Sequence, residues 1–167
     1  MGDLHSKIVS ILAKLCRDIT RESGKPWYKE VFADNVEGFE KKPLGITLVR
    51  RGRSLIQNFY PDIWAEYPRA GVDVFEVWHS ESENEAINDI VLSSLVKNIK
   101  YLHIVCTGYR ITKDKAGEFV DLILNKLHNR KGELLLSPDH VYIADIPKKI
   151  HKRPTEIEDE LRDQLKL

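Results

Sequence analysis

The sequence has few cysteines, no long apolar run and no excess of charge of either sign. Its two cysteines, Cys16 and Cys106, lie in apolar patterns without partners at metal-ligand spacing, which argues against a disulfide scaffold. No stretch approaches the roughly 20 apolar residues that a membrane span needs. The first residues make a poor signal peptide, because an acid and several polar residues interrupt them. We therefore expect a cytoplasmic protein in a reducing compartment, with no membrane partner.

The 26 basic and 26 acidic side chains cancel, so the overall charge gives no evidence for wholesale attraction to nucleic acid or membranes. A neutral total does not exclude a basic face on one side of the protein. A length of 167 residues, with 42% apolar and 31% charged residues, is typical of one globular domain. Methionine and glutamine are scarce while lysine, arginine and glutamate are abundant, a mixture that would suit a thermophile.

Apolar residues at helical spacing predict an amphipathic helix over residues 4–22, which Gly24 and Pro26 would end. Residues 27–43 mix aromatic and charged side chains and fit either a short helix or an ordered loop. The pattern leaves both alternatives open.

Short apolar segments separated by turn residues predict a three-strand meander after residue 44. Its expected strands cover residues 46–49, 55–67 and 72–78, with turns at 51–53 and 68–71. Pro61 would bend or break the second strand, because proline lacks the N–H that a sheet ladder needs. The third strand is apolar on both faces except for Asp73 and Glu76, which predicts a central position in the sheet.

Helical and strand patterns alternate after the meander. Ser82 and Glu85 form a capping box at the start of the next helix. The expected helices cover residues 82–98, 112–129 and 155–167, and the expected strands cover 101–106 and 140–146. Strand–helix–strand units this short favour parallel pairing with a right-handed crossover. We therefore expect one α/β domain with a mixed central sheet, built from the meander and these units, and helices on both faces.

Two carboxylates in the meander form the pattern most suggestive of chemistry. A hairpin through residues 68–71 would place Asp62 and Glu76 almost opposite each other, because the turn centre is equidistant from both. Two carboxylates at such a short distance repel each other unless a cation or a proton lies between them. Oxygen ligands on neighbouring strands suit Mg²⁺, which binds through one or two carboxylates plus substrate phosphates. A metal there would activate water and neutralise charge on a phosphodiester.

A first helix, a meander carrying Pro61-Asp62 and then Glu76, and a following helix and strand resemble the PD-(D/E)XK nuclease superfamily, whose fold is restriction-endonuclease-like. The resemblance covers about residues 4–108 and leaves 109–167 unassigned. It implies Mg²⁺- or Mn²⁺-dependent hydrolysis of DNA, with Asp62 and Glu76 as metal ligands and catalytic residues. It implies no small-molecule cofactor.

The family usually places a lysine two residues after the glutamate, where it orients the attacking water. Trp78 occupies that position here, and an indole carries no positive charge. His79 or a lysine from another element would have to replace it. Some members add an acid from the first helix, for which Glu22 is the candidate. The resemblance also implies a homodimer, whose two-fold symmetry would match that of a DNA duplex.

Two other interpretations remain open. In the first, no metal is present: Asp62 caps a bulge at Pro61, and Glu76 pairs with a buried Arg or Lys. The chain would then be a non-catalytic interaction or structural module that keeps the nuclease fold. Alternatively, an α/β protein would bind a small molecule at Thr107-Gly108, where a strand ends, although no glycine-rich phosphate loop follows.

Two basic clusters are candidates for phosphate contacts. The first, at the predicted hairpin turn, is formed by Arg50, Arg51 and Arg53. The second precedes the last helix and contains Lys148, Lys149, His151, Lys152 and Arg153. Each would equally be an ordinary solvated turn or linker.

Overall fold

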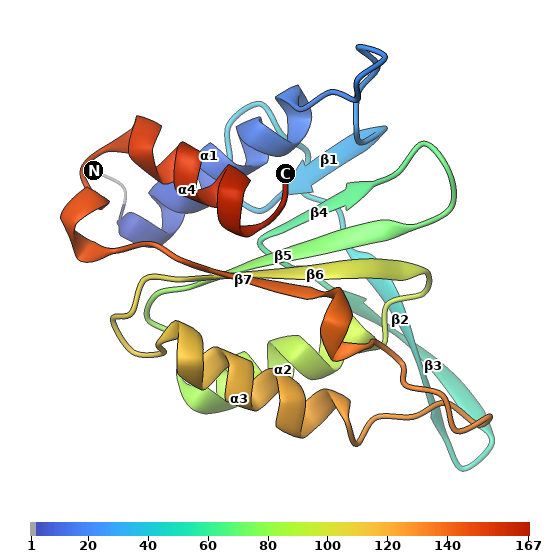
Figure 1. Cartoon of the computed structure of the whole chain (residues 1–167). Coiled ribbons are helices and arrows are strands. Elements are labelled where there is room, and N and C mark those ends of the chain that lie inside the picture. The colour runs from blue at the N-terminus through green and yellow to red at the C-terminus, as the bar shows by residue number, and fades with distance from the viewer. Residues whose placement is uncertain (1–2) are drawn as a thin grey trace.

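A five-stranded sheet runs through the middle of the protein, with helices on both faces (Figure 1). The computed structural model describes residues 3–167, apart from the side chains of residues 49 and 50. The α-helices are α1 (Leu4–Asp18), α2 (Glu83–Ser94), α3 (Lys113–Leu124) and α4 (Pro154–Gln164), and 3₁₀ turns cover Pro138–His140 and Lys148–Ile150. The strands are β1 (Glu30–Ala33), β2 (Leu44–Arg50), β3 (Arg53–Phe59), β4 (Ile63–Glu66), β5 (Val72–Trp78), β6 (Ile99–Cys106) and β7 (Val141–Asp145). None of the helices in this described part is both long and apolar enough to span a membrane.

The central sheet is mixed, as expected. Its order is β1-β4-β5-β6-β7, antiparallel from β1 to β5 and parallel from β5 to β7. Helices α1 and α4 cover one face, and α2 and α3 cover the other (Figure 1). The mixed α/β fold with helices on both faces is therefore confirmed.

Helix α1 forms because an apolar stripe coincides with a capped start. The Asp3 carboxylate accepts the Ser6 N–H at 2.8 Å. The side chains that it buries follow helical spacing: Ile8, Val9, Leu12, Ala13, Leu15 and Cys16. The helix ends at Asp18, four residues before the expected end, because Ile19 is extended and Thr20 pairs with Pro26. The capping box of Ser82 and Glu85 at α2 is present as predicted.

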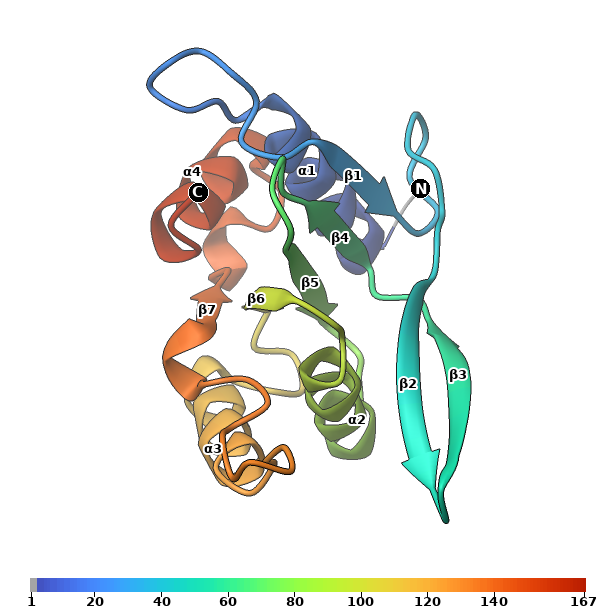
Figure 2. The same cartoon turned by 90° about the vertical axis from the view of Figure 1, so that its right-hand side faces the viewer.

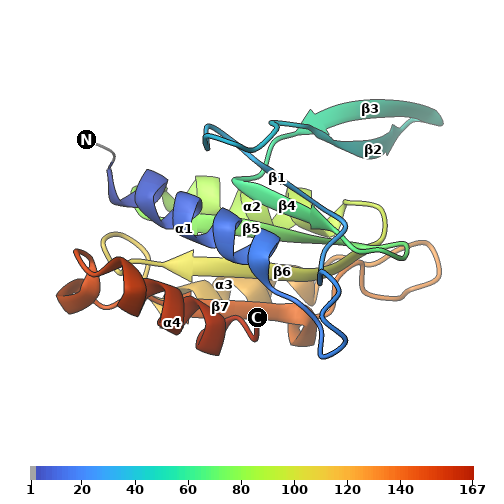
Figure 3. The same ribbon diagram turned by 90° about the horizontal axis from the view of Figure 1, so that it is seen from above.

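The first hairpin stands apart from the central sheet. Strands β2 and β3 pair with each other as a separate two-stranded sheet, which projects from the body of the protein (Figures 2 and 3). A single bridge joins Ile46 of β2 to Val96. The hairpin turn, Arg51-Gly52, has positive φ at both residues, the twist-matched conformation of tight hairpins. The expected three-strand meander in the central sheet is wrong in this respect. Of the two predicted effects of Pro61, the break is confirmed: Pro61, without an N–H, separates β3 from β4.

Residues 27–43, left open between helix and loop, contain strand β1 at the edge of the central sheet. It pairs with β4 in the place that the first hairpin was expected to take. Strand β5 is central and buried on both faces, as its apolar pattern predicted. Its side chains alternate, so that Phe75 and Val77 face α1 and α4 while Val74 and Trp78 face α2 and α3. By the same alternation, Glu76 lies on the side of Trp78.

Candidate functional site

The β4–β5 hairpin brings Asp62 and Glu76 together. Its register pairs Ile63 with Phe75, so the next position out pairs Asp62 with Glu76. The Asp62 N–H donates to Glu76 Oε1 at 3.3 Å, and the Val77 N–H donates to Asp62 Oδ2 at 2.8 Å. The turn at residues 68–71 and the opposition of the two carboxylates are therefore as their spacing indicated.

A third carboxylate, Asp89 of α2, joins the pair. It hydrogen-bonds to Glu76 and accepts the Trp78 indole N–H at 3.1 Å. Burial raises the pKa of Glu76 well above its usual range, and the neighbouring charges of Asp89 and Asp62 raise it further. Burial also raises the pKa of Asp89 to about 7, although the hydrogen bonds from Trp78 and Glu76 oppose the rise. Both shifts favour the protonated form, so a proton shared between the two acids would relieve their repulsion.

The predicted pairing of Glu76 with a buried Arg or Lys is wrong, since its partner is another acid. Among the ion pairs of the described side chains, none joins a lysine or arginine to Asp62, Glu76 or Asp89. Trp78, two residues after Glu76, is only 1% exposed and its indole carries no charge. Among the described side chains, the three carboxylates are thus left without a lysine or arginine partner.

The first helix contributes a histidine. His5 Nε2 lies 3.2 Å from Asp62 Oδ2 and 4.0 Å from Glu81 Oε1. The hydrogen bond with Asp62 is the main cause of the raised pKa of His5. Glu22 is not at this site: it is exposed beyond the end of α1, and about 20 Å of helix separates that end from His5.

His79 follows β5, but it does not point at the carboxylate pair. Its Nδ1 lies 2.7 Å from the hydroxyl of Thr107, and its backbone N–H donates to Glu81. Its ring packs against that of Tyr109 at 5.1 Å between centroids. The Thr107 hydroxyl, part of the small-molecule alternative, is therefore already bound to a neighbouring side chain.

The donor set fits a partly hydrated Mg²⁺ better than an enclosed metal. No group of three or more His, Cys, Asp and Glu side chains among residues 3–167, apart from 49 and 50, is arranged to hold an ion. Two carboxylates plus water and phosphate oxygens nevertheless meet the usual demand of Mg²⁺. A hollow of about 100 Å³ opens beside Asp62, between the first turn of α1 and residues 34–36, with His5 and Asp34 in its wall. Asp62 is thus accessible from solvent.

The two basic clusters lie in different places. Arg51 and Arg53 are exposed at the hairpin tip, and β3 separates them from Asp62 by roughly 20 Å at about 3.3 Å per residue. The side chain of Arg50 lies outside the described residues. The second cluster, residues 148–153, follows β7 at the carboxyl edge of the sheet, where Lys7 of α1 donates to the His151 carbonyl at 3.1 Å. This second cluster shares its edge with Asp62.

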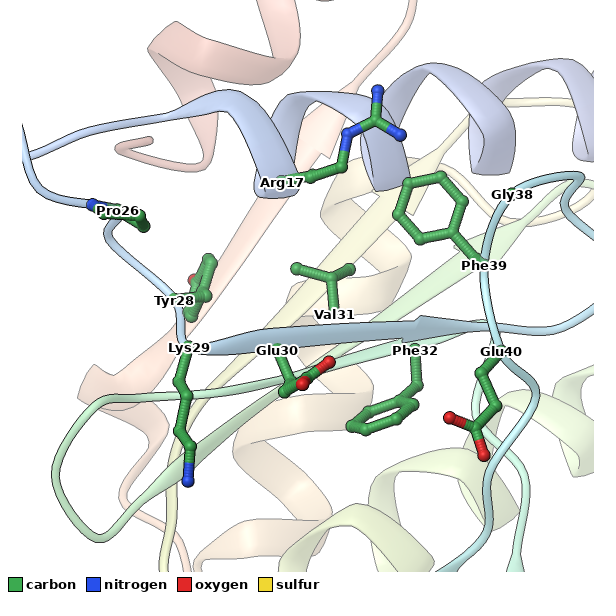
Figure 4. A pocket seen from close by; sticks show the side chains of 10 residues that line it. All are labelled: Arg17, Pro26, Tyr28, Lys29, Glu30, Val31, Phe32, Gly38, Phe39 and Glu40. Carbon is green, nitrogen blue, oxygen red and sulfur yellow. The ribbon is translucent and has the colours of Figure 1, made fainter.

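A hollow of about 450 Å³ runs along the edge strand β1 (Figure 4). None of Asp62, Glu76 and Asp89 is among the residues that line it. Its wall mixes the acids Glu30 and Glu40 with the bases Arg17 and Lys29. The Arg17 guanidinium lies 5.1 Å from the centre of the Phe39 ring across it. Balanced charge and no convergent donors make it a surface groove without a recognisable ligand chemistry.

The raised pKa values predict how pH changes the stability of the metal-free protein. A carboxyl group whose pKa is higher in the folded state stabilises the fold below its unfolded pKa, and that stability is lost as pH rises through the folded pKa. For Asp89 the window runs from 3.8 to about 7, and the raised pKa of His5 acts in the same direction. In EDTA, the midpoint of urea unfolding should therefore fall between pH 5 and pH 8. A midpoint that rises over this range would contradict the shared proton.

Comparisons with known proteins add little to this geometry. No family model matches the chain, and no curated protein matches it. Among solved structures, the chain is similar to the small subunit (R.BspD6I2) of the heterodimeric restriction endonuclease R.BspD6I, at 11% identity and a TM-score of 0.34. The similarity covers 82% of this chain and 61% of that subunit. Because a likeness this weak carries no conclusion about activity, we base the functional proposal on Asp62, Glu76 and their neighbours.

Proposed function

We propose that the protein is a divalent-metal-dependent nuclease of the PD-(D/E)XK type that acts on DNA. The observation that carries the proposal is the clustering of Asp62, Glu76 and Asp89 without a lysine or arginine ion pair among the described side chains. Such a cluster requires a proton or a cation to be stable. The cluster lies at an edge of the sheet, and a hollow opens beside Asp62. This position supports the binding of a cation that would also contact a substrate.

Asp62 and Glu76 would hold Mg²⁺ or Mn²⁺, which when bound supplies Lewis-acid polarisation of a phosphodiester and activation of water. The Val77 N–H fixes Asp62 Oδ2, leaving Oδ1 as the free ligand atom. His5, whose pKa is raised by Asp62, would hold a proton at Nε2 near the scissile phosphate. Its positive charge would take over part of the electrostatic role for which the family uses a lysine.

A specific observation favours a second candidate, the non-catalytic module. Trp78 is buried and its indole N–H closes the hydrogen-bond chain through Asp89 to Glu76. A proton shared by the two acids would then stabilise the cluster permanently, and the fold would serve only for binding DNA or protein.

Calorimetric titration with Mn²⁺ at pH 8, together with a cleavage assay, separates the two candidates. The assay would use supercoiled, linear, branched and single-stranded DNA with Mg²⁺, Mn²⁺ or EDTA. The nuclease proposal expects binding of Mn²⁺ and metal-dependent cleavage, both lost in Asp62→Asn. Asp139→Asn, an exposed carboxylate in the 3₁₀ turn before β7, is the matched control. If the folded protein neither binds Mn²⁺ nor cuts any of these substrates, the nuclease proposal is wrong and the non-catalytic module is the better explanation.

The placement of the basic clusters predicts which one binds DNA near the carboxylates. Reversing charge in Lys148→Glu/Lys149→Glu should weaken duplex binding in Ca²⁺ by about tenfold or more, and it should lower the salt slope by roughly one to two. Arg51→Glu/Arg53→Glu at the hairpin tip, exposed to the same degree, should have the smaller effect. Fluorescence anisotropy at several salt concentrations measures both. The reverse order would place the DNA along the hairpin.

The homodimer implied by the resemblance stays a prediction. Analytical ultracentrifugation of the protein with and without DNA tests it directly.

A further inference from the structure

A second hollow, of about 340 Å³, lies at the end of the sheet opposite to Asp62. The loop after α1, the β4–β5 turn and the start of β6 meet there, and Figure 1 shows the first two at the same end of the molecule. Three cations, two aromatic rings and a proline line it: Arg21, Lys100, Arg69, Trp27, Tyr67 and Pro68. No acid is among these residues, although the chain as a whole is neutral.

The positive charge of this hollow is uncompensated and partly fixed in place. None of the ion pairs among the described side chains involves Arg21, Arg69 or Lys100. The Lys100 ammonium lies 4.7 Å from the centre of the Tyr67 ring. The stem of Lys100 packs directly on Gly71, where an added Cβ would come within 2.6 Å of Lys100 Cε. Three cations around one hollow, with Lys100 held in place, suit an anion with several oxygens, such as a phosphate.

An exposed aromatic ring adjoins the cations. Trp27 is 41% exposed, whereas the other two tryptophans, Trp64 and Trp78, are buried. The loop that carries it is anchored, because the Trp27 N–H donates to the Ile19 carbonyl at 3.1 Å. A flat indole beside phosphate-binding cations is the arrangement on which a nucleobase stacks.

A smaller cavity of about 110 Å³ adjoins this hollow and shares Trp27 and Tyr67 with it. Its other walls include the rings of Tyr28, Tyr101 and His103. The His103 side chain is 3% exposed, and its Nε2 lies 3.3 Å from Asp73. None of the residues that the structure describes forms a hydrogen bond with its Nδ1. With Nε2–H donating to Asp73, Nδ1 is a buried acceptor that lacks a donor, a costly arrangement. The ring or amino N–H of a nucleobase would supply that donor.

We propose that these two hollows form a nucleotide-binding site: Arg21, Arg69 and Lys100 bind the phosphate, and the base stacks on Trp27 toward His103. The site shares no residue with the carboxylate cluster, so it does not depend on the proposed nuclease activity. The ligand is either a free mononucleotide or the phosphorylated end of a nucleic-acid strand, since both present the same phosphate and base.

Titration of the full chain in EDTA tests this, with Trp27 fluorescence and calorimetry as readouts. We expect AMP to bind saturably. Adenosine lacks the phosphate and inorganic phosphate lacks the base, so each should bind at least about tenfold more weakly than AMP, because each loses a charge-assisted or a stacking contact. Arg69→Ala should weaken AMP binding by a similar factor, and Trp27→Ala should reduce AMP to the affinity of phosphate. Both side chains are exposed, so both variants should fold, and Lys131→Ala, at an exposed lysine in the loop after α3, should leave AMP binding unchanged.

A short 5′-phosphorylated oligonucleotide and its unphosphorylated counterpart separate the two sources of the ligand. Tighter binding of the phosphorylated strand than of AMP identifies a strand end, and the reverse identifies a free nucleotide. Equal affinity of wild type and Arg69→Ala for AMP, or equal affinity of AMP and inorganic phosphate, would overturn the proposal.

Discussion

Replacing Glu76 with glutamine should abolish metal-dependent cleavage of DNA and, at the same time, stabilise the metal-free protein at alkaline pH. Cleavage should fall by at least about a hundredfold, because an amide oxygen carries no charge with which to hold a divalent cation. Stability should rise by roughly 1–3 kcal/mol at pH 8, because glutamine mimics the protonated acid and needs no proton in the buried cluster. The two effects have opposite signs and a common cause, the negative charge that Glu76 would carry in a buried acidic cluster.

Urea unfolding in EDTA at pH 5 and pH 8, beside cleavage assays with Mn²⁺, measures both effects. The stability difference between wild type and Glu76→Gln should be smaller at pH 5 than at pH 8, because burial and the neighbouring acids raise the pKa of Glu76 and favour its protonated form. Asp89→Asn is the matched variant: it should stabilise the protein at pH 8 in the same way, while keeping the Asp62–Glu76 pair and therefore measurable cleavage. If Glu76→Gln loses stability at pH 8, the glutamate forms favourable bonds as an anion, and the cation-binding proposal loses its physical basis.

The opposition of Asp62 and Glu76 could be read from the sequence because a hairpin converts spacing into proximity. A turn centred near residue 69 and a strand period of two leave one register, and the structure has that register. Asp89 was not found in this way, since its approach depends on how α2 docks on the sheet. A weak signal existed: Asp89 lies three residues after Ala86 and four before Ser93, both buried, so it falls on the inward stripe of the helix.

The expected meander failed because local patterns do not say which sheet a strand joins. Residues 44–59 have ordinary strand chemistry, but Ile46 forms a bridge with Val96 and the hairpin leaves the central sheet. The free place beside β4 is taken by β1, whose four residues are too short to show a strand period. His5 was missed for a similar reason, since only the packing of α1 against β4 and β5 brings its ring to Asp62.

The other acid in β5, Asp73, should be the most costly single position to truncate. Its side chain is 1% exposed and accepts four hydrogen bonds. The hydroxyls of Tyr28 and Tyr67 each donate to Oδ2 at 2.6 Å, and the Tyr101 N–H donates to Oδ1 at 3.1 Å. His103 supplies the fourth contact. The donors come from three different segments, so Asp73 ties the loop after α1, the β4–β5 turn and β6 together.

Asp73→Ala should lower the free energy of unfolding by roughly 3–5 kcal/mol, because it leaves these buried donors without an acceptor. Burial and the charge of Asp73 raise the pKa of Tyr28 and of Tyr67, so neither phenol ionises near neutral pH to relieve the loss. Tyr28→Phe removes one donor and keeps the acceptor, and should cost only about 1–2 kcal/mol. Urea unfolding at pH 7, with the exposed Asp163→Ala as a control expected within about 0.5 kcal/mol of wild type, measures the series.

A loss for Asp73→Ala no larger than that for Tyr28→Phe would mean that water replaces the carboxylate easily. The cavity of about 110 Å³ beside Asp73 would then be hydrated, and the unpartnered Nδ1 of His103 would have a water as its donor. A large loss instead means that the tyrosines and Asp73 form a rigid wall. A rigid wall of that kind is what a pocket needs to hold one flat ligand in a fixed orientation, so the stability of Asp73→Ala and the binding of AMP are expected to fall together.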